Sequence, residues 1–206
     1  MKNITVICEG YTEANYISAL NDYVWSISQE VNLDERNLKG INRNNYISKI
    51  RKSLNTLAVP NITTYIFLDK DIFIRAGDNI NDVVSEIESV ANQLIAKSKK
   101  KATIVGVIKV IFNTMNGEDM MILHENENIA KQWHEIMKTK NHFITPLVAK
   151  DYEPLIKSIN SQYKKNQKII IDSEKIQKFQ ANNDNPEISM QSDISELVQM
   201  VIEQEQ

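Results

Sequence analysis

The sequence predicts an α/β protein with a mostly parallel β-sheet, flanked by helices and followed by a small helical C-terminal extension. Short runs of strand-forming residues alternate with longer segments that repeat apolar residues at helical spacing, which is typical of a parallel sheet covered on both faces. One run, 63–69 (TTYIFLD), is almost continuously apolar, as expected of a strand buried on both sides. The final part of the chain carries only short helical patterns, such as 193–204 (DISELVQMVIEQ).

The first third of the chain predicts a strand, a turn and a helix, and then a second helix. Residues 3–8 alternate around β-branched types and predict the first strand. Apolar residues at helical spacing predict a helix over 12–29, started by Thr12 as its N-cap. The segment 40–57 (GINRNNYISKIRKSLNTL) predicts the second helix, which leads to the buried strand 63–69.

The rest of the chain continues the alternation. Apolar spacing predicts a helix over 80–97, and the apolar run 103–112 (TIVGVIKVIF) predicts another buried strand. Two further helices are predicted over 118–138 and 151–165. The polar stretch 180–187 (QANNDNPE) is typical of a linker or loop.

Length and composition set the broad class of the protein. With 206 residues and 42% hydrophobic content, the chain can form one sizeable core, and we expect a main domain over 1–150 with a helical extension over 151–206. No apolar stretch is long enough to span a bilayer, and the first residues lack the apolar region of a secretory signal. The single cysteine, Cys8, is expected to pack in the core and agrees with a reducing compartment. We therefore expect a cytoplasmic protein without a membrane partner.

The charge balance does not indicate a nucleic-acid binder by itself. The formal net charge is -3, whereas binding to phosphates relies on clusters of Lys and Arg. The two densest basic clusters are 97–101 (KSKKK) and 163–168 (YKKNQK). We expect each of them to be a solvated helix end, with phosphate contact as the alternative.

Acidic residues follow three of the strand-like runs. Crossovers between parallel strands are right-handed, so the ends of successive strands gather at one edge of the sheet, and acids far apart in sequence can meet there. Carboxylates that converge without Cys or His suit hard cations such as Mg²⁺ or Mn²⁺. The alternative for any one acid is a helix cap or a loop charge. The pairs are Glu9 with Glu13, Asp69 with Asp71, and Glu118 with Asp119.

Two local patterns make these acids candidates for a site. Gly10, directly after Glu9, permits a tight turn and close approach of a phosphate to the backbone. Asp69 and Asp71 are two positions apart, so their side chains point the same way if the strand continues through both residues. Lys70, between them, would then point to the opposite face.

Three motifs together resemble the RloB-like family, whose Toprim domain is related to the Toprim half of the OLD-family nucleases. They are CEGYTE, FLDKD and NGEDMMILHE, and the resemblance covers roughly residues 3 to 165 in order and spacing. The first matches a strand that ends in Glu-Gly with a Thr-Glu pair, the second an Asp-x-Asp pair, and the third a Phe-Glu-x-Trp stretch that ends in His. The matching residues are Glu9, Gly10, Thr12 and Glu13; Asp69 and Asp71; and Glu118, Ile122, Leu123 and His124.

The third motif departs from the family pattern. Gly117 stands where the family tends to have Phe, and Met120 stands in the Trp position. The Asn-Pro that precedes the motif in the family is reduced here to FNTMN, residues 112–116. The first two motifs are intact.

The resemblance implies a Toprim-like fold and metal-dependent cleavage of phosphodiester bonds in DNA or RNA. It implies that carboxylates hold one or two Mg²⁺ or Mn²⁺ ions, which activate a water and stabilise the leaving oxygen. Glu9 either binds the metal or moves the proton as general acid and base. The family further implies an antiphage, abortive-infection role beside a partner ATPase of the ABC or AAA type. The implied ligands are Glu9, Glu13, Asp69, Asp71 and Glu118.

Two further residues are candidates for supporting roles. Lys109, in the strand 103–112, is a cationic candidate for transition-state charge, and an ordinary strand lysine is the alternative. His124 ends an apolar run; it is either a packing histidine or, together with Gly10, part of the support around the metal or phosphate. His134 and His142 have no comparable context.

Other functions remain open from the sequence. The chain has no G-x-x-x-x-G-K-[ST] phosphate loop, so it does not hydrolyse ATP by that route. The strand-end Asp69 also allows a haloacid-dehalogenase-type phosphatase, although that class wants Thr or Val where this chain has Phe73 and leaves CEGYTE unexplained. A Toprim-like module that binds a metal or a partner without cleaving is the third reading. The choice between DNA and RNA and the state of homo-oligomerisation are also open.

Overall fold

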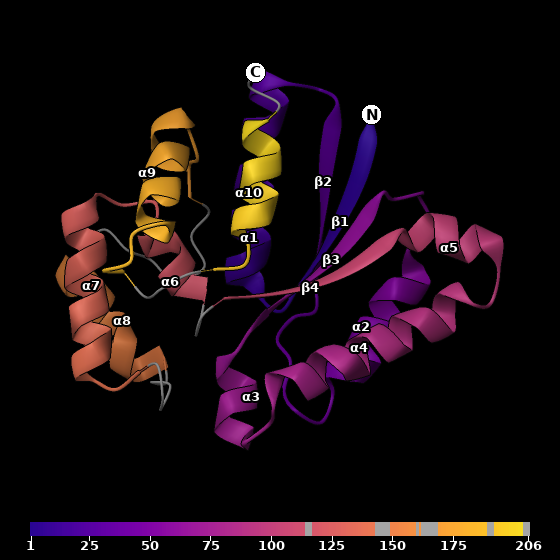
Figure 1. The fold of residues 1–206 in the computed structure, drawn as a ribbon, viewed down its shortest axis with the longest axis horizontal. Helices are drawn as coiled ribbons and strands as arrows, with labels where there is room; N and C mark the ends of the chain where they lie inside the picture. Colours follow the sequence, from indigo (N-terminus) through magenta and orange to yellow (C-terminus); the bar gives the residue numbers. More distant parts are fainter. Residues whose placement is uncertain (114–116, 143–148, 160, 162–168, 189–191, 204–206) are drawn as a thin grey trace.

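The computed structural model describes residues 1–113, 117–142, 149–159, 161, 169–188 and 192–203 (Figure 1). In these ranges the strands are β1 (Lys2–Cys8), β2 (Val31–Asn37), β3 (Thr63–Asp69) and β4 (Val107–Asn113). The helices are α1 (Tyr11–Ile27), α2 (Tyr46–Thr56), α3 (Asp71–Ala76), α4 (Ile80–Ile95), α5 (Lys99–Val105), α6 (Gly117–Ile122), α7 (Glu127–Thr139), α8 (Ala149–Ile159), α9 (Ser173–Asn183) and α10 (Ser195–Ile202).

The four described strands form one parallel sheet in the order β2-β1-β3-β4. The predicted fold class, a parallel α/β sheet flanked by helices, is therefore confirmed. The chain first moves from β1 to β2 on one side and then returns to place β3 on the other side of β1. In open α/β sheets, ligands bind outside the carboxyl ends of the strands at such a reversal. Here it lies between the ends of β1 and β3.

The sheet is covered on both faces, and each face has its own core (Figure 1). Alternate residues of the strands face opposite sides, so Val6 and Phe67 join the core under α1, while Ile7 and Ile66 join the core under α2 and α4. Cys8 is fully buried, as the sequence predicts for a packing residue. Packing in these two cores fixes the positions of the strand ends, and therefore the positions of the residues that directly follow the strands.

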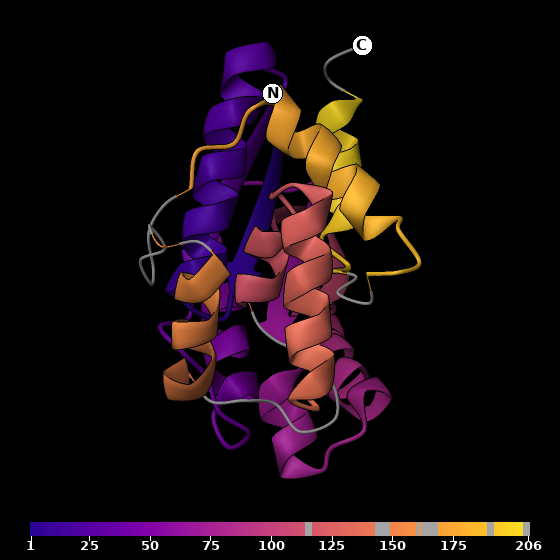
Figure 2. The same cartoon turned by 90° about the vertical axis from the view of Figure 1, so that its left-hand side faces the viewer.

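The C-terminal helices belong to the α1 side of the molecule. Ile156 of α8, Phe179 of α9 and Val201 of α10 are in the same buried cluster as α1 and β1. Figure 2 shows α7 flanked by α8 and α9, with α10 behind them. The segment that follows residue 150 thus extends the core of the α/β part.

Several boundaries differ from the sequence predictions. Strand β2 was not predicted, because VNLDERN lacks an apolar run and carries three charged residues, of which Glu35 and Arg36 are exposed. The helix predicted over 118–138 is divided into α6 and α7, and the side chain of Asn126 caps α7 by accepting a hydrogen bond from the backbone N–H of Ile129 (3.0 Å). The start of the strand predicted over 103–112 is instead the end of α5, which Ser98 caps.

The first helix also begins differently from its prediction. It starts at Tyr11 with Gly10 as N-cap, so Thr12 lies inside the first turn and does not cap the helix. The part of the predicted helix 151–165 beyond residue 161 lies outside the described residues. Among the helices that the structure describes, none is both long and apolar enough to cross a membrane.

Candidate functional site

Two carboxylates meet at the carboxyl ends of β1 and β3, where the order in which strands are added to the sheet reverses. Glu9 follows the last residue of β1, and Asp69 is the last residue of β3. The backbone N–H of Asp69 donates to Oε2 of Glu9 (3.0 Å), and the backbone N–H of Glu9 donates to the carbonyl of Phe67 (3.0 Å). The predicted convergence of Glu9 and Asp69 is therefore present, and it follows from the pairing of neighbouring strands.

Glu13 adds a third carboxylate from the first turn of α1. Its side chain is buried, and its Oε2 accepts a hydrogen bond from the backbone N–H of Gly10 (2.9 Å). A carboxylate in this position stabilises the helix N-terminus, so Glu13 has a capping role in addition to any role in a site. Its other oxygen faces Gly117, where a Cβ atom would overlap with Oε1 of Glu13 and lie 2.8 Å from Cγ2 of Thr12.

Glu118 brings a fourth carboxylate from α6. It is buried, and its negative charge raises the pKa of both Glu13 and Asp69. The close fit of Gly117 against Glu13 explains how α6 approaches the start of α1. The absence of a side chain at residue 117 is thus what lets α6 approach the start of α1.

Burial and mutual repulsion make these carboxyl groups hard to ionise together. Burial raises the pKa of Glu9 to about 8, and the charge of Glu13 adds to the rise, while the hydrogen bond from Asp69 and the charge of Arg75 oppose it. Burial also raises the pKa of Glu13 to about 7, with Glu118 contributing. The pKa of Asp69 is well above its usual value because of burial and the charges of Glu13 and Glu9. At neutral pH, Glu9 therefore mostly keeps its proton unless a cation replaces it.

Asp71 does not join this cluster in the way that the sequence predicts. The strand ends at Asp69 and the chain turns at Lys70 into α3, so the alternation of a strand does not extend to residue 71. Asp71 instead occupies the first turn of α3 and forms an ion pair with Arg75, one turn further on. The sequence predicts that Asp69 and Asp71 point the same way if the strand continues through both, and this condition is not met.

Lys109 lies away from the cluster. It is opposite Tyr65 in the sheet, four residues before Asn113, which is opposite Asp69. At roughly 3.3 Å per residue, that is a separation of about 13 Å along the strand. The Lys109 ammonium group forms an ion pair with Glu196 of α10. The structure therefore gives Lys109 the role of an anchor for α10.

His124 is a buried packing residue. Its Nε2 lies 3.0 Å from the hydroxyl of Tyr16, its Nδ1 lies 3.0 Å from the carbonyl of Lys175, and its ring packs against Phe179. Burial lowers the pKa of His124 to about 4, so the ring is neutral at physiological pH. These contacts join the turn after α6 to α1 and α9, and they favour the packing alternative over a contact with the metal or phosphate.

Asp119 and His142 form a buried group behind the cluster. The indole Nε1 of Trp133 donates to Oδ1 of Asp119 (2.8 Å), and Nε2 of His142 lies 3.9 Å from Oδ2 of the same carboxylate. All three side chains are buried. The sequence singled out Asp119 only as the neighbour of Glu118, and it gave no signal for Trp133 or His142, because they lie 14 or more positions further along the chain.

Sequence reasoning also missed two residues that contact the site. Asn113, the last residue of β4, donates from Nδ2 to Oδ1 of Asp69 (2.8 Å), and the hydroxyl of Ser192 donates to Oδ1 of Asn113 (3.1 Å). Asn113 could have been found from its place at the end of a predicted strand. Ser192 has no such signal, since it is 79 positions further along the chain.

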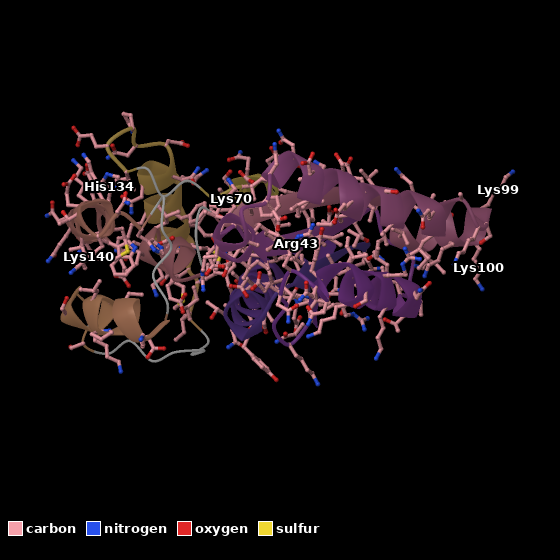
Figure 3. The ribbon with its side chains drawn as sticks, turned by 90° about the horizontal axis from the view of Figure 1, so that it is seen from below. Arg43, Lys70, Lys99, Lys100, His134 and Lys140 are labelled. Carbon is pink, nitrogen blue, oxygen red and sulfur yellow. The ribbon has the colours of Figure 1, made fainter. Side chains whose placement is uncertain are left out.

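The described basic cluster is remote from the acids. Figure 3 shows Lys99 and Lys100 at one end of the molecule and His134 at the other, with Lys70 between them. Lys70 directly follows Asp69, and its ammonium group lies 5.9 Å from the centre of the Phe112 ring. It is thus a cation at the same edge of the sheet as the acids. The cluster 163–168 lies outside the described residues.

Comparisons of this chain with protein-family models, with curated proteins and with solved structures find no match.

The donor set of the cluster has the chemistry of a hard-cation site. Within the described ranges, no group of three or more His, Cys, Asp or Glu side chains is already arranged to ligate a metal ion. The nearby carboxylates nevertheless offer only oxygen, and their raised pKa values show negative charge that their surroundings compensate poorly. Mg²⁺ and Mn²⁺ prefer such ligands. By donor chemistry the cluster fits a divalent cation, with Glu9, Glu13, Asp69 and Glu118 as the residues that would hold it.

Substituting Gly117 with alanine is expected to displace Glu13 from the cluster, because the new Cβ overlaps with its Oε1. We expect a loss of about 1–3 kcal/mol in the free energy of unfolding, typical of overpacking, and weaker binding of Mn²⁺ in calorimetric titration. Gly77→Ala is the matched control. Its Cβ meets nothing within 4 Å, and its positive φ costs about 1–2 kcal/mol at the C-terminus of α3 without contact with Glu13. Equal Mn²⁺ binding by both variants would contradict the prediction.

Proposed function

We propose that this protein is a Mg²⁺- or Mn²⁺-dependent nuclease that hydrolyses phosphodiester bonds in DNA or RNA. The observation that carries the proposal is the gathering of Glu9, Glu13, Asp69 and Glu118 at the carboxyl edge of a parallel sheet, at the reversal between β1 and β3. Carboxylates at such an edge are the ligands through which divalent cations act in phosphoryl chemistry. The motif resemblance to RloB-like proteins supports the same activity.

The residues of the cluster divide into two roles. When bound, a divalent cation supplies a polarised water and stabilises the charge of the leaving oxygen. Glu13, Asp69 and Glu118 would hold the cation, since Glu13 and Glu118 are buried and Asp69 is tied to Asn113. Glu9 is only half-buried, and its pKa of about 8 lies near neutral pH, so it is the residue that transfers the proton.

Lys70 and Arg75 supply positive charge beside these acids. Lys70 adjoins Asp69, and Arg75 is close enough to lower the pKa of Glu9. We assign them to the phosphate groups that flank the scissile bond, since cations fix a nucleic-acid backbone near a site without reading its sequence. Arg75 shares its charge with Asp71, so Lys70 makes the larger contribution.

The biological setting follows from the motif resemblance. We propose that the chain is the effector of a bacterial antiphage system in the cytoplasm and that a partner ATPase controls it. The chain has no phosphate loop of its own, in agreement with a separate ATPase. A phosphatase of the haloacid-dehalogenase type is less well supported, because it leaves Glu9, Glu13 and Glu118 without a role.

Cleavage assays test the proposal. The purified full-length chain is incubated with labelled single- and double-stranded DNA and RNA in Mg²⁺, in Mn²⁺ or in EDTA, with a phosphate monoester as a parallel substrate. We expect cation-dependent cleavage of at least one nucleic acid, none in EDTA, and no turnover of the monoester. Lys100→Ala, remote from the acids, is the control and should cleave like the unmodified chain (Figure 3).

Three outcomes separate the alternatives. Cleavage of nucleic acid supports the nuclease. Turnover of the monoester alone would establish a phosphatase instead. Binding of Mn²⁺ without cleavage of any nucleic acid, even with the ATPase from the same genetic locus, would leave only a non-catalytic module and would overturn the proposal.

A further inference from the structure

A buried chain of hydrogen bonds connects the C-terminal segment to the acidic cluster. The hydroxyl of Ser192 donates to Oδ1 of Asn113 (3.1 Å), and Nδ2 of Asn113 donates to Oδ1 of Asp69 (2.8 Å). Asn113 is fully buried, and Ser192 is 3% exposed. Burying a polar group costs free energy unless it forms a hydrogen bond. These two hydrogen bonds are therefore a specific arrangement and not an incidental contact.

The chemistry of Ser192, Asn113 and Asp69 determines which group donates each of these hydrogen bonds. To ligate a cation Asp69 must be ionised, and an ionised carboxylate can only accept hydrogen bonds, so Asn113 presents its NH₂ group to Asp69 in that state. The carbonyl oxygen of the Asn113 amide then points away from Asp69, where it needs a donor, and the hydroxyl of Ser192 supplies one. Without Ser192, the amide could rotate and present its oxygen to the carboxylate, which is repulsive.

The position of Asn113 follows from the sheet. Asp69 and Asn113 are paired in the parallel register of β3 and β4, so their side chains leave the sheet on the same face as neighbours. The backbone N–H of Asp69 is in turn held by Glu9. Asp69 is therefore fixed from both sides, through its backbone by β1 and through its side chain by β4.

The position of Ser192 follows from contacts of the next residue. The backbone N–H of Asp193 donates to the carbonyl of Phe112 (3.0 Å), and the backbone N–H of Phe112 donates to Oδ2 of Asp193 (3.2 Å). This exchange clamps the segment to β4 one residue before Asn113. The ion pair of Glu196 with Lys109 anchors the start of α10 further up the same strand.

We propose that Asn113 is a positioning residue for the acidic site, that it acts by orienting the carboxylate of Asp69, and that Ser192 fixes its orientation. The C-terminal segment at 192–193 is then part of the site and not only of the core. The functional consequence rests on the proposed cation-dependent nuclease; the orientation of Asp69 does not.

Variants of Ser192 and Asn113 test this in the full-length chain. Ser192→Ala removes the donor to Asn113, and Asn113→Leu removes the NH₂ group that faces Asp69 without adding a charge. Glu196→Gln is the control, since it weakens the anchor of α10 but leaves the chain of hydrogen bonds intact. The measurements are the NMR signals of the Asn113 side-chain NH₂ and the Asp69 carboxyl carbon, Mn²⁺ affinity by calorimetry, the rate of cleavage, and thermal unfolding.

We expect Ser192→Ala to shift both NMR signals and to weaken Mn²⁺ binding about threefold to tenfold. Asn113→Leu is expected to weaken binding about 10- to 100-fold, as is usual for residues that orient a ligand. Glu196→Gln should change neither the signals nor the Mn²⁺ affinity, even where it lowers the unfolding temperature by as much as the other variants. This comparison distinguishes positioning from a general structural role.

Two results would overturn the inference. The first is a folded Ser192→Ala variant with unchanged signals of Asn113 and Asp69. The second is a change in those signals with wild-type Mn²⁺ affinity. If the unmodified chain neither binds Mn²⁺ nor cleaves nucleic acid, the proposed function fails, and the NMR signals alone then decide whether Ser192 and Asn113 orient Asp69.

Discussion

Replacing Asp69 by asparagine is expected to lower the rate of cleavage by more than about 100-fold, because loss of a residue that merely orients a ligand already costs about 10- to 100-fold. The same substitution should stabilise the cation-free protein. Asp69 is destabilised by burial and by the charges of Glu13 and Glu9, and an amide of the same shape removes that repulsion. Oδ1 of the new side chain can still accept from Asn113. We expect a gain of about 0.5–2 kcal/mol in the free energy of unfolding.

Denaturant unfolding in EDTA near pH 8, beside the cleavage assay, checks this prediction. Asp34→Asn is a matched control, since Asp34 lies on the edge strand β2 and forms a largely exposed ion pair with Arg36. That control should keep full activity and lose no more than about 1 kcal/mol. An Asp69→Asn variant that is less stable than the unmodified chain, or that cleaves at a comparable rate, would contradict the assigned role of Asp69.

The stability of the cation-free protein is expected to fall as the pH rises through about 7 to 8. Glu9 and Glu13 have folded-state pKa values raised to about 8 and about 7, so the folded state holds more protons than the unfolded state in this range. A group of this kind contributes stability that is fully present below its unfolded pKa of about 4.5 and is lost as the pH rises through the folded value. Deprotonation then leaves several negative charges together.

A divalent cation should reverse this dependence. Because the cation binds the ionised carboxylates, its stabilising effect should grow with pH, reaching about 2.7 kcal/mol at a hundredfold excess over its dissociation constant. Thermal unfolding in EDTA and in Mn²⁺, between about pH 6.5 and 8.5, measures both effects. Below pH 6.5, His124 and His142 also change the stability with pH. Their folded-state pKa values are lowered from 6.5 to about 4, so their contribution to stability is complete only above pH 6.5.

The double variant Glu9→Gln/Glu13→Gln provides the control for the pH dependence. Its amides do not titrate, so its stability in EDTA should change less between pH 6.5 and 8.5 than that of the unmodified chain. It should also gain little from Mn²⁺. A cation-free protein that becomes more stable across this range, or a double variant with the same response to Mn²⁺, would contradict the prediction.

The parts of the site that were predictable from the sequence depend on local patterns. A strand must end where its run of apolar residues ends, and parallel strands must end at the same edge of the sheet. Glu9 and Asp69 therefore meet at that edge for reasons visible in the sequence. The pattern also indicated Glu13 and Glu118, because each follows a predicted strand within a few residues.

The errors occur where a local pattern does not determine how the chain continues. The sequence permits β3 to run through Asp71, but the chain turns at Lys70 and α3 begins, so Asp71 pairs with Arg75. Lys109 was a candidate for stabilising transition-state charge, but in the structure it forms an ion pair with Glu196, which α10 brings to the strand. In each case a partner outside the strand pattern determines where the side chain lies.

The sequence by itself determined that this is a parallel α/β protein and that acids stand at the ends of its strands, because alternation, apolar runs and turn residues act over a few positions. Only the tertiary structure decided which acids come together and which residues hold them. Asp69 is oriented through Asn113 by Ser192, a residue 79 positions beyond Asn113. That contact exists because the last helices pack on the same face of the sheet as α1, and such packing depends on the whole core.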